Sequence, residues 1–433
     1  MLAAACGDDS ESSETTAAAT ETTGGSTETT GATETTGGST ETTGAPETTV
    51  DPLGTPNEAS GDPIVVGVIN EGGSDVGEEQ SAKTLKGMQM AADYANEYLG
   101  GIGGHPIEIE SCGNKNTPTG ATDCANQMVE KQIDVYIHPY SGFESQIVTV
   151  LSPAGIPMFL AGSSSQEGLT SPGVFAMGGG YVATLGAFAV DALEQGVTKF
   201  AMIVTDVPAA ANTSAALGGM TFGKMGVAFE NVPVPLGTAD FTPILQTAIA
   251  NGADALGLTG DASFCVSFMQ AYKALALTAT KYIISTCLDQ SVLEAVGDVI
   301  DGSRTVTSRG SADAVAADMA IFAAALLKYG GDFSDMDPEH SGGIMDGWVT
   351  MMGLVNALSG YTGEIDNASL TEAIKAATDV PIPMSGGLTF TCDGTAIPIL
   401  ANICSAALQI GVVDENGEFG ELAPIDASVA FAT

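Results

Sequence analysis

Short apolar runs alternate with longer amphipathic segments along the chain from residue 64 onward. Residues 64–69 are an apolar run too short for a helix, and residues 107–110 alternate isoleucine with glutamate, as in a strand. Residues 78–99 instead place apolar side chains at helical spacing. The same reasoning predicts further strands at 133–137, 157–161, 199–205, 228–232, 255–258, 282–285 and 304–308. It predicts further helices at 117–131, 143–153, 182–195, 209–225, 241–251, 262–276, 291–296, 313–329 and 342–358. Strands that alternate with helices are typical of doubly wound α/β folds.

The chain has 433 residues, which is long enough for two domains. The run 173–177 leads into the glycines at 178–180, which we interpret as a crossing between two lobes. Near the C-terminus, residues 388–391 and 397–403 are predicted to form a strand pair, and another apolar run follows at 406–413. Two lobes joined by several crossings suit a hinge that closes on a ligand.

The segment 133–170 is predicted to fold as a strand, a helix and a strand, and each strand ends in a loop of small polar residues. The first loop contains Ser141, and the second contains Gly162, Ser163 and Ser164. In an open parallel sheet, ligands bind beyond the carboxyl ends of the strands, where both loops are expected. Hydroxyl and backbone N–H groups there can hold a carboxylate or another anion. The alternative is that both loops are ordinary turns in which serine caps a helix.

Two further stretches carry a family resemblance: Ile-Val-Val-Gly-Val at 64–68 and Gly-Gly-Ile-Gly-Gly-His-Pro-Ile-Glu at 100–108. With the two polar loops, they make the chain from about Asp62 to its end resemble the type I periplasmic binding proteins. It is most similar to their leucine/isoleucine/valine-binding branch, which comprises substrate-binding proteins of ABC transporters. The resemblance implies two doubly wound α/β lobes joined by a multi-strand hinge. It implies an N-terminal lobe of residues 62–178 plus 309–386 and a C-terminal lobe of residues 179–308 plus 387–433.

The resemblance also implies which residues bind the ligand in the first lobe. In this branch, the loop after the third strand ends in a serine that binds the ligand carboxylate, which matches Ser141. The loop after the fourth strand adds backbone and hydroxyl groups, which match Gly162, Ser163 and Ser164.

Four further positions are expected to line the cleft between the lobes. Asp261 stands where amino-acid binders of the family usually carry an aromatic residue, and a glutamate that binds the ligand ammonium is expected near Asp289. Val76 occupies the place where an aromatic side chain often covers the ligand, and Tyr181 lies at the crossing between the lobes. Each aspartate has the alternative role of a helix cap.

The N-terminal residues differ in kind from the rest of the chain. Residues 1–6, Met-Leu-Ala-Ala-Ala-Cys, resemble the end of a lipoprotein signal peptide with Cys6 as the lipidated residue, and the upstream part of such a peptide is missing. Residues 7–61 consist almost wholly of Thr, Glu, Gly, Ser and Ala and repeat with a period of thirteen. A segment without large apolar residues cannot offset the entropy of ordering, so we predict a disordered tether.

Net charge limits the partners of the protein. The chain carries 53 acidic and 12 basic residues, and 12 of the acidic residues precede Ile64, so the remainder has a net charge of −29. Nucleic acid and anionic membrane surfaces would be repelled. A saline habitat and a well-solvated surface both account for this acidity. No run of eighteen apolar residues occurs, so a membrane-spanning helix is not expected, and contact with the membrane is expected through the lipid anchor alone.

Seven cysteines are typical of an exported protein. Without Cys6, six remain, and six cysteines allow 15 connectivities. Proximity in the sequence favours three local pairs: Cys112 with Cys124, Cys265 with Cys287, and Cys392 with Cys404. A zinc site is not expected, because the sequence has no CxxC pair and its three histidines are far apart.

These features predict a lipid-anchored extracellular protein that binds a small polar solute and delivers it to an ABC permease. The solute would be an amino acid or a related carboxylate or amide. A sensor of the same fold without a transport role is the first alternative. An extracellular hydrolase that uses Ser141 or Ser164 is the second, but the sequence has no GxSxG, HExxH or P-loop motif. We therefore expect no enzymatic activity, no cofactor and no metal.

Overall fold

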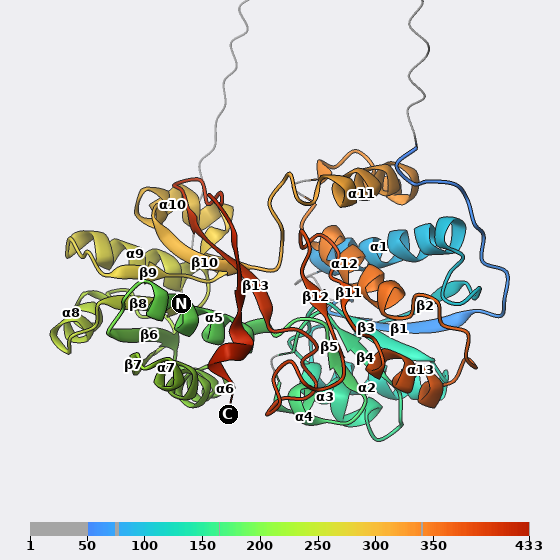
Figure 1. Cartoon of the computed structure of the whole chain (residues 1–433), viewed down its shortest axis with the longest axis horizontal. Helices are drawn as coiled ribbons and strands as arrows, with labels where there is room; N and C mark the ends of the chain where they lie inside the picture. The colour runs from blue at the N-terminus through green and yellow to red at the C-terminus, as the bar shows by residue number, and fades with distance from the viewer. Residues whose placement is uncertain (1–50, 74–77, 164, 339–340, 433) are drawn as a thin grey trace, which may run out of the picture. The chain divides into compact units, whose positions relative to one another are not determined.

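The computed structural model describes residues 51–73, 78–163, 165–338 and 341–432, which form two α/β lobes (Figure 1). The first lobe contains a five-stranded parallel sheet in the order β2-β1-β3-β4-β5. Its strands are β1 (Ile64–Asn70), β2 (Ile107–Gly113), β3 (Val135–His138), β4 (Met158–Leu160) and β5 (Val174–Ala176). The predicted doubly wound α/β fold is confirmed.

Helices cover both faces of the first sheet (Figure 1). On one face, Val66 and Val68 share a buried cluster with residues of α1 (Glu78–Tyr94), α11 (Ala316–Tyr329) and α12 (Gly343–Ala357). On the other face, Ile69 and Tyr136 share a cluster with residues of α2 (Pro118–Glu130) and α3 (Glu144–Leu151). The alternation of apolar residues along the strands therefore fills both layers.

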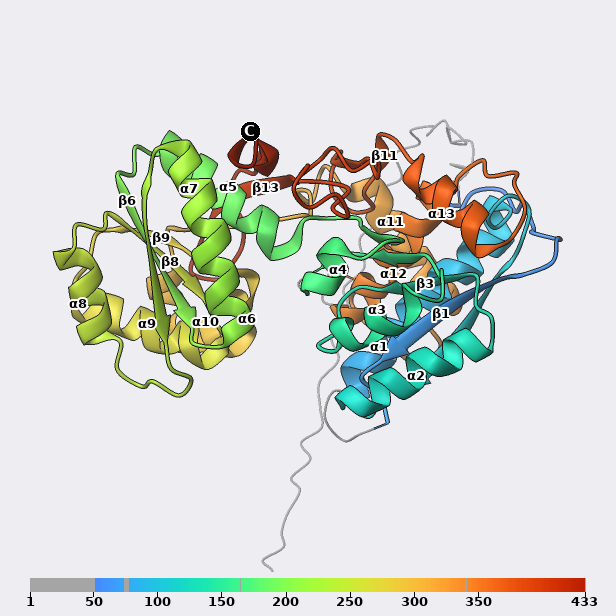
Figure 2. The ribbon, with the colours of Figure 1, turned by 90° about the horizontal axis from the view of Figure 1, so that it is seen from below.

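The second lobe contains a seven-stranded sheet in the order β14-β13-β10-β9-β8-β6-β7 (Figure 1), and Figure 2 shows this lobe from below. The strands are β6 (Lys199–Thr205), β7 (Ala228–Val234), β8 (Ala255–Thr259), β9 (Thr280–Tyr282), β10 (Ser303–Thr307), β13 (Ala407–Val413) and β14 (Ala423–Asp426). The first five are parallel, whereas β13 and β14 add antiparallel pairs at one edge. One face carries α5 (Gly180–Glu194) and α7 (Gly219–Met225), and the other carries α8 (Thr242–Ala250), α9 (Ala262–Ala274) and α10 (Gln290–Ile300).

The chain passes between the lobes after β5, after β10 and before β13. Hydrogen bonds join residues 384–385 of the first lobe to the second crossing and to β13: Gly310 N donates to Met384 O at 3.0 Å, and Gln409 Nε2 donates to Ser385 O at 2.7 Å. After the second crossing, α11 and α12 return to the first lobe, as the family resemblance implies.

Several segments differ from their predictions. Residues 397–403 are not a strand: they form turns closed by Leu400 N to Ile397 O and Ile403 N to Leu400 O, which turn Ile397 and Ile403 into the second-lobe core and leave Ile399 exposed. Accordingly, β12 (Thr389–Phe390) pairs with β11 (Val380–Pro381) instead. The strand predicted at 282–285 ends at Tyr282, since a 3-10 turn, Ser285–Leu288, begins shortly after it.

Other helices have different lengths, and several elements were missed, among them α4 (Gln166–Thr170) and β11. The helix predicted at 291–296 continues to Ile300, with a kink at Val296. Residues 209–225 form α6 (Pro208–Thr213), a π-helical turn (Ser214–Gly218) and α7. The elements α13 (Asn367–Lys375) and β14 were not predicted.

Helices α1 and α12 approach each other through glycine. A Cβ on Gly347 would lie 2.0 Å from Thr84 O of α1, and one on Gly87 would lie 1.8 Å from Ile344 O. Both obstacles are backbone atoms, which cannot move aside as a side chain does.

We expect Gly347→Ala to lower the free energy of unfolding by about 1–3 kcal/mol, because the added methyl overpacks this helix contact. Urea denaturation followed by circular dichroism measures the change. Gly223→Ala is the matched control, since Gly223 lies in α7 with nothing within 4 Å of its Cβ position, and it should stabilise by up to about 1 kcal/mol. Equal effects of the two substitutions would contradict the close approach.

Three cysteine pairs lie with their sulfur atoms at bonding distance, and they are the pairs predicted from proximity in the sequence. In the first lobe, Cys112 at the end of β2 pairs with Cys124 of α2. In the second lobe, Cys265 of α9 pairs with Cys287 of the 3-10 turn that follows β9. Near the C-terminus, Cys392 pairs with Cys404. This third pair does not staple the predicted strand pair, because residues 397–403 form turns and Cys404 follows them. Each bridge therefore closes a short local loop.

We predict that thiol labelling of the unreduced, denatured chain modifies none of these six cysteines, whereas labelling after reduction modifies all six. Peptide mass spectrometry identifies the labelled positions. If, for example, Cys124, Cys287 or Cys404 were labelled without reduction, the bridge of that cysteine would be ruled out.

Candidate ligand-binding site

The loop after β3 holds a carboxylate of the protein itself. Ser141 is buried, and its Oγ donates to Glu71 Oε1 at 3.0 Å. The backbone N–H of Gly142 points to the same oxygen at 3.3 Å. Glu71 directly follows β1, which pairs with β3, so the parallel sheet brings the two loops together at its carboxyl edge. The serine predicted to receive a ligand carboxylate therefore binds Glu71 in this structure.

The loop after β4 binds a second carboxylate, that of Glu144. Ser163 Oγ donates to Glu144 Oε1 at 2.5 Å, and Ser165 Oγ donates to the same oxygen at 2.7 Å. Glu144 is the first residue of α3, and only 4% of it is exposed. Ser165 also accepts from Gly168 N and so caps α4 (Gln166–Thr170). Glu144 thus joins the two polar loops.

Histidine and tyrosine of β3 complete this buried network. His138 Nε2 lies 3.8 Å from Glu144 Oε2, and Tyr136 Oη lies 3.0 Å from His138 Nδ1. Burial would raise the pKa of Glu144, but His138 and the two serine hydroxyls outweigh it, so the pKa lies below its ordinary value. Burial and the nearby carboxylates of Glu71 and Glu144 raise the pKa of Tyr136 well above its ordinary value. Both carboxylates therefore lie close to one phenol.

A glycine makes the contact around Glu144 possible. A Cβ on Gly168 would lie 1.7 Å from Glu144 Oε1 and 2.3 Å from Ser163 Oγ. The first turn of α4 therefore lies directly against the carboxylate, which excludes water from that side.

The second lobe places its predicted residues at the carboxyl edge of its own sheet. Asp261 Oδ1 accepts from Phe264 N at 2.9 Å and from Ser263 Oγ at 2.7 Å, so Asp261 caps α9. These two hydrogen bonds lower the pKa of its carboxyl group. Asp289 is exposed and precedes α10, and its side chain forms no cap there. The helix-cap alternative therefore describes Asp261 but not Asp289.

Tyr181 lies in the first turn of α5, directly after the first crossing. The Oγ1 of Thr259, at the end of β8, lies 3.3 Å from Tyr181 Oη. Gly162 lies close to the same crossing, since its Cβ position would be 3.7 Å from Gly178 O and from Gly180 Cα. The structure thus brings the loop after β4 to the segment that carries Tyr181. Val76, Ser164 and Cys6 lie outside the described residues.

Sequence reasoning missed Glu71 and Glu144. Glu71 follows the first strand in the sequence, so its place at the carboxyl edge of the sheet could be predicted from the strand assignment. Glu144 opens the helix after Ser141, where an acidic residue is ordinarily explained by the helix dipole. No signal in the sequence marks its burial.

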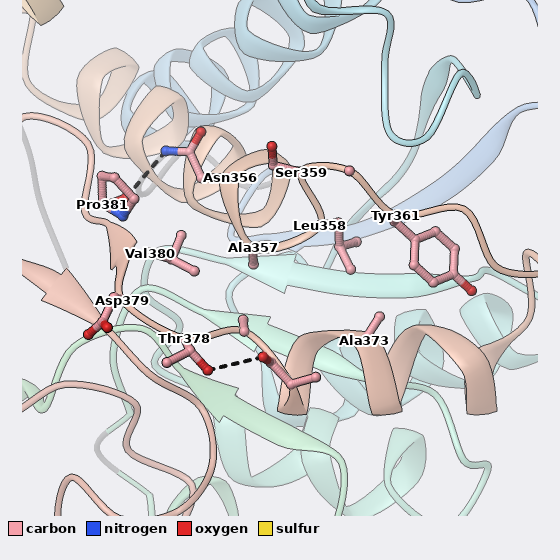
Figure 3. Close-up of a pocket in the computed structure, with 13 residues that line it drawn as sticks. Asn356, Ala357, Leu358, Ser359, Tyr361, Ala373, Thr378, Asp379, Val380 and Pro381 are labelled. Carbon is pink, nitrogen blue, oxygen red and sulfur yellow. Dashed lines mark hydrogen bonds between the residues drawn. The ribbon is translucent and has the colours of Figure 1, made fainter.

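Two surface hollows lie elsewhere. One, of about 610 Å³, is lined by residues from the C-terminal ends of α12 and α13 and from β11 (Figure 3). The other, of about 530 Å³, shares Asn356, Ser359 and Gly360 with it. None of the predicted site residues lines either hollow. Among the described residues, no group of three or more His, Cys, Asp or Glu could hold a metal ion.

The part of the chain that the structure describes has no helix long and apolar enough to cross a membrane. Comparison with curated protein sequences gives no match. Solved structures with a similar fold include an ABC transporter substrate-binding protein from Sphaerobacter thermophilus, with a TM-score of 0.67 and 20% identity over 86% of this chain and 100% of that one.

Two other similar structures contain a ligand. The substrate-binding protein LivJ of a branched-chain amino acid transporter from Streptococcus pneumoniae, in complex with isoleucine, has a TM-score of 0.62 and 16% identity over 84% of this chain and 99% of that one. A solute-binding protein from R. palustris in complex with 4-hydroxybenzoate has a TM-score of 0.62 and 17% identity over 84% and 97%. The sequence profile described as periplasmic binding protein matches residues 63–406, and the chain therefore belongs to the periplasmic binding protein family.

Proposed function

We propose that this protein is the extracellular solute-binding component of an ABC importer and that it holds a small polar solute between its two lobes. The observation that carries this proposal is the set of polar groups at the carboxyl edge of the first sheet, where Ser141, Gly142, Ser163 and Ser165 surround two carboxylates. The family comprises binding proteins rather than enzymes, in agreement with the expected absence of catalysis.

The solute belongs to the class of amino acids and related carboxylates or amides. Support comes from the resemblance to the leucine/isoleucine/valine-binding branch and from the similar structures, one of which holds isoleucine and another 4-hydroxybenzoate. The second lobe adds Tyr181, Thr259 and Asp289 at its sheet edge. Closure would then be driven by contacts that the solute makes with both lobes at once.

The N-terminal residues support a place on the outer face of the membrane. Cys6 follows small residues and precedes Gly7, as at a lipidation site, and the Thr/Glu/Gly/Ser segment that follows supplies a tether. The predicted end of this tether is wrong: residues 51–61 pack on the first lobe, where Leu53 is buried and Asn57 N donates to Glu97 O. The proposed partners are therefore the solute, the permease subunits and, through the lipid, the membrane.

A thermal-shift screen of the purified chain tests the function, because a ligand that binds only the folded state raises the melting temperature. The panel holds amino acids, amides, small carboxylates and sugars, and solute released from the denatured protein is identified by mass spectrometry. A shift with amino acids, amides or carboxylates supports the proposal. A panel without a shift, together with no released solute, contradicts it.

Ser141→Ala should weaken binding of the identified solute at least about tenfold, because its hydroxyl holds the polar groups of the first loop in place. Isothermal titration calorimetry measures the affinity. Ser152→Ala is the control: this serine lies just after α3, and its Oγ donates to Pro172 O, so affinity should not change. An unchanged affinity in Ser141→Ala would rule out the role of this loop.

Glu144→Gln should lower the free energy of unfolding at pH 7 by about 1–3 kcal/mol, because the neutral amide loses the charge that strengthens the hydrogen bonds from both serines and the electrostatic interaction with His138. The pKa of Glu144 in the folded state lies below its ordinary value of 4.5. The ionised Glu144 therefore contributes its full share to the free energy of unfolding above pH 4.5, and this share is lost as the pH falls through the pKa of the folded state. Denaturation curves between pH 7 and pH 3 should show a shallower acid loss in the variant than in the wild type. Glu108→Gln, on the exposed side of β2, is the control and should keep the wild-type slope.

A further inference from the structure

The groups that would receive a solute carboxylate in the first lobe are already bound to the protein. Ser141 Oγ and Gly142 N both point to Glu71 Oε1, at 3.0 and 3.3 Å. In the second loop, Ser163 and Ser165 donate to Glu144. A solute carboxylate at this edge would have to displace a carboxylate that the same donors already hold.

Charge acts against such a displacement. Glu71 and Glu144 both lie close enough to Tyr136 to raise its pKa, so the edge carries two neighbouring negative charges. A third carboxylate would be repelled by both and would gain only the hydrogen bonds that Glu71 gives up. Glu71 is half-buried, whereas Glu144 is almost fully buried, so Glu71 is the one that solvent or a solute can reach.

A carboxylate only accepts hydrogen bonds, and its two oxygens provide about four acceptor positions. The donors from Ser141 and Gly142 both use Oε1 of Glu71. What Glu71 can offer a solute is therefore acceptor capacity, which an N–H donor satisfies. Charge-assisted hydrogen bonds of this kind are among the stronger ones in proteins.

We infer that Glu71 determines the specificity of the first lobe. Its carboxylate occupies the donors of Ser141 and Gly142 that would otherwise bind a solute carboxylate, so the solute presents an N–H donor, from an amide or an ammonium group, instead of a carboxylate. This inference rests on the proposed function and restricts it to solutes that present an amide or an ammonium group to the first lobe.

Two basic residues at the sheet edges do not alter this conclusion. Lys115 follows β2, and its Cγ lies 3.3 Å from the Cβ position of Gly73. Arg309 follows β10, and its charge acts on Asp346 of α12. Either could bind a solute carboxylate away from Ser141, so a Lys115→Gln variant separates that arrangement from the one inferred here.

The experiment compares matched compounds that differ only in the group at one end: amino acids, their carboxamides and the amines that lack the carboxyl carbon. Titration calorimetry on the full chain should show that amides or amines bind the wild type at least about tenfold more tightly than the matched carboxylates. In Glu71→Gln this preference should shrink at least about tenfold, because the charge that attracts ammonium and repels carboxylate is gone. Glu71→Asp, which keeps the charge, should retain the direction of the preference.

Controls separate the possible outcomes. Glu110→Gln removes one charge from the middle of β2 and should leave the preference unchanged, and thermal unfolding checks that each variant is folded. A wild type that prefers carboxylates, with tighter carboxylate binding in Glu71→Gln, overturns the inference but leaves the proposed function intact. A wild type that prefers carboxylates and loses this preference in Lys115→Gln also overturns it. If the protein binds none of the three series of compounds, both the inference and the proposed function are overturned.

Discussion

The candidate site depends on one buried carboxylate. Glu144 is almost completely removed from water, and an ion in that position is tolerated only when hydrogen bonds and an opposite charge replace the lost solvent. Ser163 and Ser165 come from the loop after β4, His138 comes from the end of β3, and Glu144 itself opens α3. The requirement to satisfy Glu144 therefore fixes the loops of neighbouring strands against each other, and Gly168 allows α4 to close over them.

Much of the scaffold follows from local patterns in the sequence. Strands such as β1, β3, β4, β6 and β8 were predictable because each is a short apolar run, and α1 and α12 were predictable from helical spacing. Residues 397–403 were wrongly predicted to form a strand. Their buried residues, Ile397 and Ile403, reach the core from a loop and not from a strand of a sheet. The elements α13 and β14 were missed because they are short, at nine and four residues.

The candidate site was predictable in position but not in chemistry. Ser141 and Ser163 lie at the carboxyl edge of the first sheet, as the topology requires, and Tyr181 lies beside the crossing. No local pattern indicates that Glu71, seventy residues before Ser141, binds its hydroxyl, because that contact arises from the pairing of β1 with β3. Asp261 shows the converse: a residue assigned to the cleft by family position has its carboxylate engaged as a helix cap.

A site whose hydroxyl groups are already hydrogen-bonded within the protein selects solutes differently from one whose hydroxyl groups face water. A hydroxyl that faces water gains a partner when a solute binds, but a hydroxyl already paired with Glu71 can only exchange one partner for another. The free energy of binding then depends on how much better the hydroxyl binds the solute than it binds Glu71. This difference is small when the solute group resembles the Glu71 carboxylate, and the negative charge of such a solute makes binding unfavourable. A solute that complements Glu71 keeps the internal pair and adds to it. Because the first lobe is built from such pairs, discrimination among solutes there depends more on charge and donor pattern than on the number of hydrogen bonds.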